Sequence, residues 1–181
     1  FSRLRKYVVR SRLIILTAIT MLGLGLGYMF GAKGTGFAKK GSIKWLSYNE
    51  GMETAKKEGK LVLINFVTHW CEWCKKMDEE TYSNEDVRSL IKKGFIPIRV
   101  DAQMQGEASY KGRKMGYKEL AVHYNVKEVP TAWFVEPDGT LIKMMPGKIE
   151  PDFFIKTLGY VKDRTYKTNV SLAEYAGVKR P

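Results

Sequence analysis

The sequence predicts a three-layer α/β domain with a mixed sheet, preceded by one N-terminal transmembrane helix. From residue 43 onward, short apolar runs typical of strands alternate with stretches of helical period. One of these runs, KLVLINFVT at 60–68, is rich in branched apolar residues, as expected of a central strand that is buried on both faces. A third observation is an uncharged apolar run at 13–30, which would span about 27 Å as a helix.

The first half of the domain contains three expected helices and three expected strands. A short strand over 42–46 leads into a helix that ends at Gly59, and the buried strand follows. A second helix begins inside or just after the cysteine motif and carries CKKMDEETY. A third helix has Ser83 as its N-cap candidate and ends before Gly94, and the strand FIPIRVD follows it.

The second half begins with residues 102–118, which are polar and contain several glycines, so we expect an exposed insertion without regular structure. A helix over 118–126 follows. Two strands, TAWFVE and TLIKMMP, are joined as a hairpin by a Pro-Asp-Gly turn at 137–139. Pro151 suits the first turn of a closing helix. The predicted domain spans 43–161, and residues 162–181 form a polar C-terminal tail.

The N-terminal part is interpreted as a signal anchor. Residues 1–12 carry five positive side chains and no negative one, residues 13–31 form the span, and residues 32–42 form a linker. A cleaved secretory signal would have a shorter apolar core and a small-x-small cleavage site, which is not evident here. The positive-inside rule places residues 1–12 in the cytoplasm. We therefore expect a single-pass membrane protein whose domain is periplasmic or extracellular.

The glycine spacing in the predicted span and the net charge of the chain each suggest a binding partner. Gly23, Gly27 and Gly31 lie on one face of the predicted span and would let another helix approach closely, in a homodimer or a larger membrane complex. The alternative is that glycine is simply common in membrane helices. The formal net charge of +12 favours contact with membrane lipid. The lysines are dispersed and no recognition motif is present, so we expect no binding to nucleic acid.

The chain has only two cysteines, Cys71 and Cys74, in C-x-x-C spacing. Covalent haem attachment requires a histidine directly after the second cysteine, but Lys75 stands there. A structural zinc site needs two more ligands, and the only histidines are His69 and His123. Two inert buried cysteines would not account for their position at the start of a helix. We expect a redox-active pair that uses no metal and no other cofactor.

A helix N-terminus favours this chemistry at Cys71. Free backbone amides and the helix dipole stabilise a thiolate there, and Lys75 adds positive charge, whereas Glu72 opposes the thiolate slightly. The thiolate is the attacking species in disulfide exchange. Cys74, one turn further along the helix, is placed to attack a mixed disulfide and release the product. Outside the cytoplasm such disulfide chemistry is thermodynamically permitted.

The C-x-x-C pair directly follows a buried strand, and VPT at 129–131 lies between a helix and a strand. With these features, residues 43–161 resemble the thioredoxin superfamily, in particular the periplasmic thioredoxin-like domain of membrane thiol–disulfide interchange proteins. The resemblance implies that Cys71 is the nucleophile and Cys74 the resolving cysteine. It also implies a cis peptide bond at Pro130. The supporting residues that it assigns around the substrate groove are Trp70, Val129 and Thr131.

Two positions depart from the family pattern. Glu72 and Trp73 stand between the cysteines, where thioredoxin itself has glycine and proline. Asn65 occupies a strand position that often carries a buried aspartate in the family. Because an amide takes up no proton, Asn65 cannot serve as general base for the resolving cysteine. Water, Glu72 or His69 would then have to do so.

The sequence therefore predicts a membrane-anchored thiol–disulfide oxidoreductase, with the resemblance favouring a reductase. Its partners would be protein thiols or disulfides outside the cytoplasm. A second hypothesis of another class is an accessory or scaffold subunit that uses the domain for docking in a membrane complex. The two hypotheses differ in whether the function survives the loss of both cysteines.

Overall fold

The computed structural model describes residues 42–178. In this part of the chain no helix has both the length and the apolar character needed to cross a membrane. The predicted basic segment, the predicted span at 13–31 and its three glycines all lie outside the described residues.

Four strands form one mixed sheet in the order β2-β1-β5-β6. Their bounds are Leu61–Val67 for β1, Phe95–Asp101 for β2, Thr131–Val135 for β5 and Leu141–Pro146 for β6. β1 runs parallel to β2 and antiparallel to β5, and β5 runs antiparallel to β6. All seven residues of β1, Asn65 included, are buried, which confirms the central strand that its branched apolar residues predict.

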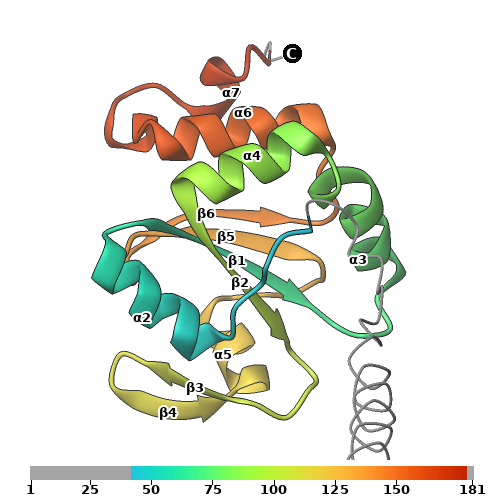
Figure 1. Cartoon of the computed structure of the whole chain (residues 1–181), viewed down its shortest axis with the longest axis vertical. Helices are drawn as coiled ribbons and strands as arrows, with labels where there is room; N and C mark the ends of the chain where they lie inside the picture. Colours follow the sequence, from blue (N-terminus) through green and yellow to red (C-terminus); the bar gives the residue numbers. More distant parts are fainter. Residues whose placement is uncertain (1–41, 179–181) are drawn as a thin grey trace, which may run out of the picture. The chain divides into compact units, whose positions relative to one another are not determined.

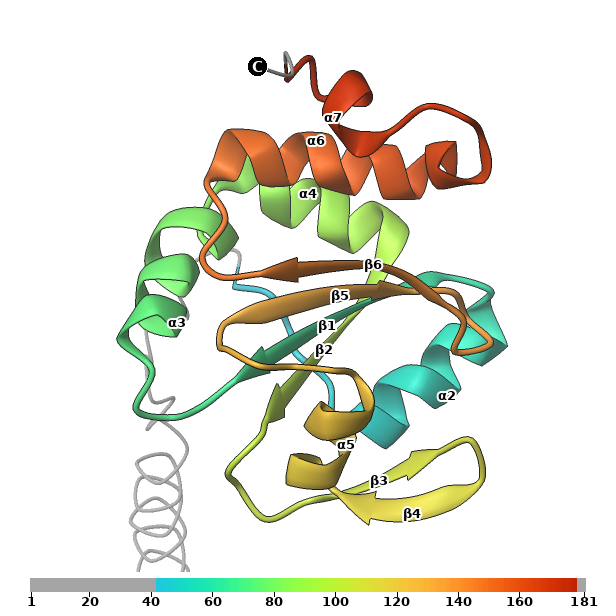
Figure 2. The same cartoon turned by 180° about the vertical axis from the view of Figure 1, so that it is seen from behind.

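Helices cover both faces of this sheet, as Figure 1 shows. Helices α4, Glu85–Gly94, and α6, Pro151–Lys162, lie on one face. Helices α2, Tyr48–Glu58, and α5, Tyr117–His123, lie on the other, which is also visible from behind in Figure 2. Successive strand residues point to opposite faces, so β1 contributes Leu61 and Leu63 to one core and Val62, Ile64 and Phe66 to the other.

Several local predictions are confirmed. Helix α2 ends at Gly59, whose φ of 65° is the left-handed conformation that stops a helix at low cost for glycine. Strand β2 coincides with the predicted FIPIRVD segment. Pro151 stands in the first turn of α6, where its missing N–H leaves no helical hydrogen bond unmade. The turn at 137–139 joins β5 and β6 as an antiparallel hairpin.

Two local predictions are wrong. The segment 42–46 forms no strand, because only Leu46 pairs with the sheet, through one isolated parallel bridge to Ile98. The N-cap of α4 is Asn84 rather than Ser83. The Asn84 side chain accepts hydrogen bonds from two backbone amides of the first turn, whereas the Ser83 hydroxyl donates to the carbonyl of Glu79.

The polar segment 102–118 also differs from the prediction, since most of it forms a second sheet of two strands. Strand β3, Glu107–Tyr110, pairs antiparallel with β4, Arg113–Gly116. The two-residue turn between them, Lys111 and Gly112, has positive φ at both positions, which suits a tight hairpin. Each strand buries one apolar side chain, Ala108 or Met115, in the core beneath α2 and α5.

The residues after α6 pack back onto it. A short helix, η2, covers Thr165–Lys167, and α7 covers Leu172–Tyr175. The rings of Tyr160 and Tyr175 meet edge to face, and Lys156 Nζ donates to the carbonyl of Ala176. The tail up to residue 178 is thus continuous with the packed structure of the domain.

Candidate functional site

Cys71 ends the short loop between strand β1 and helix α3, Glu72–Met77. The π-helical turn η1, Asp78–Tyr82, continues α3 without a break. Cys71 is the N-cap of α3, and its Sγ accepts the backbone N–H of Cys74 at 3.0 Å. The backbone N–H of Cys71 in turn donates to the carbonyl of Thr68 at 3.1 Å. These bonds fix Cys71 at the positive end of the helix, where a thiolate is stabilised.

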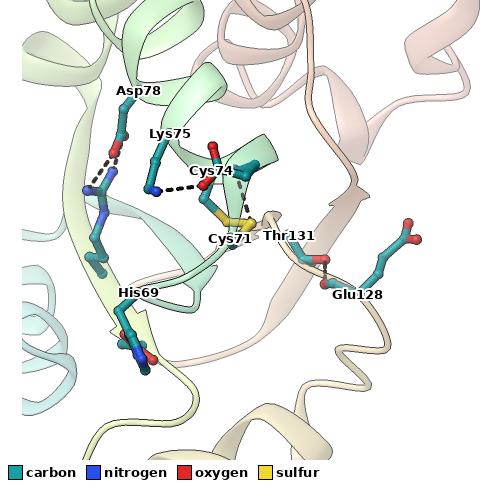
Figure 3. The surroundings of a disulfide bond; sticks show 10 residues. His69, Cys71, Cys74, Lys75, Asp78, Glu128 and Thr131 are labelled. Atoms are coloured by element: carbon teal, nitrogen blue, oxygen red, sulfur yellow. Dashed lines mark hydrogen bonds and ion pairs between the residues drawn. A yellow bond between two sulfur atoms is a disulfide. The ribbon is translucent and has the colours of Figure 1, made fainter.

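The two cysteines are joined in a disulfide, with their Cα atoms 5.2 Å apart (Figure 3). Cys71 is 5% exposed and Cys74 is 7% exposed. They pack against Val67 at the end of β1 and against the partly buried Val129. The structure therefore brings the predicted C-x-x-C pair and the predicted VPT segment together, although almost sixty residues separate them.

The Val129–Pro130 peptide bond is cis, as the family resemblance implies. Pro130 is buried, and its carbonyl accepts the N–H of Gly147 at 2.8 Å. The hydroxyl of Thr131 donates to the carbonyl of Glu128 at 2.7 Å, which closes the turn before β5 (Figure 3). The proline thus lies in a turn that is held on both sides and placed beside the disulfide through Val129.

Two exposed tryptophans flank the disulfide. Trp70 is 57% exposed and Trp73 is 58% exposed, although large aromatic side chains are usually buried. The indole N–H of Trp70 donates to Gln103 Oε1 at 2.8 Å, and Lys76 Nζ lies 4.6 Å from the ring centre of Trp73. Gln103 is a site residue that the sequence does not single out, since it lies in the segment predicted to be an exposed insertion.

Charged side chains near the cysteines are mostly paired. Lys75 Nζ lies 2.6 Å from Glu72 Oε1, and this hydrogen bond lowers the pKa of the Glu72 carboxyl. Glu72 and Lys75 thus largely offset one another's effect on Cys71. His69 Nδ1 lies 3.6 Å from Asp101 Oδ2. The His69 side chain is 66% exposed, two residues before Cys71.

Asn65 is 1% exposed and lies within β1 on the same face as Leu63 and Val67. Its Oδ1 atom is buried and has no hydrogen-bond partner within the described part of the protein. The strand therefore presents a neutral amide, rather than an acid, on the face that leads to the disulfide.

The two histidines do not contribute to a common ligand set. His123, the last residue of α5, stacks on the ring of Tyr110 with the ring centres 5.6 Å apart. Within residues 42–178, no three side chains among histidine, cysteine, aspartate and glutamate are grouped so that they could hold a metal ion. The chemistry that this geometry supports is thiol–disulfide exchange at Cys71 and Cys74.

Comparison with known proteins agrees with this site. Residues 48–162 match the family model of the thioredoxin-like domain. Disulfide bond reductase DsbH of Chlamydia pneumoniae is 24% identical over 105 residues, which cover 58% of this chain and 63% of that protein. Thiol:disulfide interchange protein DsbD of Campylobacter jejuni is 28% identical over 155 residues, which cover 76% of this chain and 27% of that protein.

Among solved structures, a thioredoxin-fold protein from Helicobacter pylori superposes with a TM-score of 0.62 at 23% identity, covering 66% of this chain and 84% of that one. This likeness concerns the fold. The chain spans between 8% and 63% of the lengths of the curated relatives it matches. Because the family match covers more than half of the chain and the fold agrees with it, the chain belongs to the thioredoxin-like domain family.

Proposed function

We propose that this protein is a membrane-anchored thiol–disulfide oxidoreductase that reduces disulfides of proteins outside the cytoplasm. The observation that carries the proposal is the Cys71–Cys74 disulfide at the start of α3, with the N–H of Cys74 donated to Cys71 Sγ. The same N–H would stabilise a thiolate on Cys71 after reduction. Cys71 is therefore the attacking sulfur, and Cys74 is the resolving one.

The reaction proceeds in two exchanges. The thiolate of Cys71 attacks one sulfur of a substrate disulfide, and the other substrate sulfur leaves as a thiolate that takes up a proton. The Cys74 thiol then loses its proton, and the resulting thiolate attacks Cys71 Sγ, so that the Cys71–Cys74 disulfide forms and the second substrate sulfur is released. Two electrons pass to the substrate, and a dithiol donor must reduce the pair again for each turnover.

The direction and the location rest on different observations. The relatives named disulfide bond reductase and thiol:disulfide interchange protein support reduction. The charged segment 1–12 and the apolar run at 13–31 support an anchor with the domain on the outer side. A compartment outside the cytoplasm also supplies protein disulfides as substrates.

Trapping the intermediate tests the reaction. In a Cys74→Ser variant the second exchange is blocked, so substrates should accumulate as mixed disulfides on Cys71 and run as heavier, thiol-sensitive bands on non-reducing gels. A variant with both cysteines replaced by serine is the control and should trap nothing. If cells expressing Cys74→Ser yield no mixed disulfide, the enzymatic proposal is wrong. A cellular phenotype that the doubly substituted protein still rescues would instead favour the scaffold hypothesis.

The reduction potential of the pair decides the direction. We expect the Cys71–Cys74 couple, equilibrated against glutathione buffers and followed by alkylation of free thiols, to be more reducing than glutathione. A clearly more oxidising potential would make the protein an oxidase or isomerase instead.

A further inference from the structure

A surface groove lies beside the disulfide, between the loop 102–106 and helix α5, and has a volume of about 730 Å³. The first wall contains Gln103 and Met104. The second contains Val122 of α5 and Val126, which follows the helix. Gly106, which precedes β3, and Gly116, the last residue of β4, also line the groove. The hairpin insertion therefore helps to build this groove.

The groove begins at the loop 68–71, which joins β1 to α3 and carries Cys71. Thr68, which lines it, accepts the backbone N–H of Cys71 at 3.1 Å. Gln103, which also lines it, holds the indole of Trp70 at 2.8 Å. The backbone N–H of Ala102, another lining residue, donates to the carbonyl of Val67. The loop that carries Cys71 is thus connected to the groove through Thr68, Gln103 and Ala102.

Apolar side chains are exposed along this path. Met104 is 60% exposed on one wall, and Val122 is 72% exposed on the other. Trp70 and Trp73 are similarly exposed on the cysteine side. The other exposed large apolar side chains in the described part of the chain, Leu141, Tyr175 and Val178, are all less exposed than these four. Exposed apolar groups gathered next to a reactive centre indicate a surface that a partner covers.

The residues that line the groove carry one positive charge, while Asp101, just outside it, accepts the backbone N–H of Gln103 at 2.9 Å. Lys118 is the one charged residue among those that line it within residues 42–178, and it is exposed. The nearest acid on the same helix, Glu119, is already shared between Arg113 at 3.5 Å and His123 at 3.7 Å. On the hairpin, Glu107 pairs with Lys114 at 3.0 Å. Unlike these carboxylates, Lys118 has no ion-pair partner among the described residues, which leaves its charge available to a ligand.

We propose that this groove binds the polypeptide segment next to the reactive disulfide of a substrate, and that it selects segments carrying an apolar and an acidic side chain. Met104 and Val122 contact the apolar side chain, and Lys118 pairs with the carboxylate. The inference rests on the proposed function, because continuity with Cys71 is what identifies the occupant as substrate.

Single-turnover reduction of two model peptides tests this specificity. Each peptide carries one cysteine in a disulfide with 2-mercaptoethanol and a nearby leucine, and the two differ only in having two glutamates or two lysines beside it. The full chain is reduced beforehand and kept in mild detergent, and bis(2-hydroxyethyl) disulfide serves as a small neutral substrate. We expect the acidic peptide to react about fivefold faster at low salt, with the preference falling as salt rises.

Substitutions in the groove test which residues cause the preference for the acidic peptide. Lys118→Glu should abolish or invert the ratio of the two peptide rates, a ratio in which any change of intrinsic thiol reactivity cancels. Lys57→Glu, an equal charge change on the exposed side of α2, should leave the ratio as it is. The pair Met104→Ser and Val122→Ser should slow both peptides about tenfold relative to bis(2-hydroxyethyl) disulfide.

The outcomes distinguish a failure of the groove assignment from a failure of the proposed oxidoreductase function. Equal rates for the two peptides, or a ratio unaffected by Lys118→Glu, would overturn the groove assignment while reduction of bis(2-hydroxyethyl) disulfide still upheld the oxidoreductase. Failure of the reduced protein to react with any of the three disulfides would overturn both.

Discussion

Asn65 shows at the scale of one residue how the site departs from a simple acid–base arrangement. It is buried in β1 on the face that leads to Val67 and the disulfide, and its Oδ1 atom has no hydrogen-bond partner among residues 42–178. An amide holds its place by packing but cannot take the proton that Cys74 must lose before it attacks. Proton removal therefore falls to groups in contact with solvent, such as water, Glu72 or His69.

Replacing Asn65 with aspartate should make the resolution step depend more strongly on pH near neutrality. Burial disfavours the charged carboxylate, so the new group would titrate above the usual range of an aspartate and act as a base only when ionised. Stopped-flow tryptophan fluorescence of the second exchange from pH 5 to 9 measures this effect. Asn65→Leu controls for the loss of the amide. Identical pH profiles for the wild type and Asn65→Asp would refute the argument.

Glu136 links two elements, the end of β5 and the helix η2. Its carboxylate accepts hydrogen bonds from Lys167 at 2.7 Å, from the Tyr166 hydroxyl at 2.7 Å and from Arg164 at 2.9 Å. Burial works against ionisation here, yet these three donors outweigh it and lower the pKa of Glu136 to about 2. The pKa of Tyr166 is raised to about 12, first because burial disfavours the charged phenolate and second because the hydroxyl donates its hydrogen bond to Glu136.

A Glu136→Gln variant should lose stability in a pH-dependent way. A carboxyl whose pKa is lowered by folding stabilises the protein above its ordinary pKa near 4.5, and this contribution disappears as the pH falls toward 2. At pH 7 we expect a loss of about 1–3 kcal/mol in the free energy of unfolding, measured by urea titration. The difference from the wild type should shrink between pH 4.5 and 2. Glu53→Gln, on the exposed side of α2, is the matched control, and a difference that stayed constant with pH would contradict the assignment.

Gly51 determines how closely helix α2 approaches strand β2. A Cβ at this position would lie 2.2 Å from Ile98 Cγ1 and 2.5 Å from its Cδ1, so the helix or the isoleucine would have to move. We expect Gly51→Ala to cost about 1–3 kcal/mol in unfolding free energy, despite the higher helix propensity of alanine. Adding Ile98→Val removes one of the clashing atoms and should recover part of that loss in a double-mutant cycle. Strict additivity of the two substitutions would show that the contact does not limit the packing.

The elements that the sequence predicts well are those whose pattern is local and strong. Strand β1 is apolar apart from Asn65. Gly59 and Pro151 mark the end of one helix and the start of another by their own backbone chemistry. The β3–β4 hairpin is not predictable in this way, because each strand buries a single apolar side chain, Ala108 or Met115. With one buried position in each strand, the sequence shows no alternation of apolar and polar residues that would predict a strand.

At the site, the same distinction separates the cysteines from their surroundings. Cys71 and Cys74 are conspicuous by spacing alone, and the family resemblance adds Pro130. The contacts of Trp70 with Gln103, and of the cysteines with Val129, depend on how distant loops meet at the end of the sheet. The prediction of a strand at 42–46 is wrong for a related reason. The apolar residues of this segment pack against the core, but only Leu46 joins the hydrogen-bond ladder of the sheet.

The distribution of charge over the whole molecule bears on its place in the cell. Of the 31 lysines and arginines, 8 lie in residues 1–41, where there is no acidic residue. Residues 42–178 contain 21 of them against all 19 acidic residues, so the domain is nearly neutral. The excess positive charge thus belongs mainly to the ends of the chain. This distribution is the one expected if the basic residues orient the predicted span at 13–31, more than that of a generally basic binding surface.

A labelling experiment tests the resulting topology. The full chain, expressed in a bacterium, should remain with the membrane fraction after a carbonate wash. Its reduced cysteines should react with a membrane-impermeant maleimide added to spheroplasts, because the domain is expected on the outer side. Replacing the five basic residues of segment 1–12 with glutamine removes the orienting charge and should lower the labelled fraction severalfold, whereas the same number of lysine changes on the exposed surface of residues 42–178 should not. Labelling that appears only after the membrane is permeabilised would place the domain in the cytoplasm, where its disulfide would have to serve a different, transient redox role.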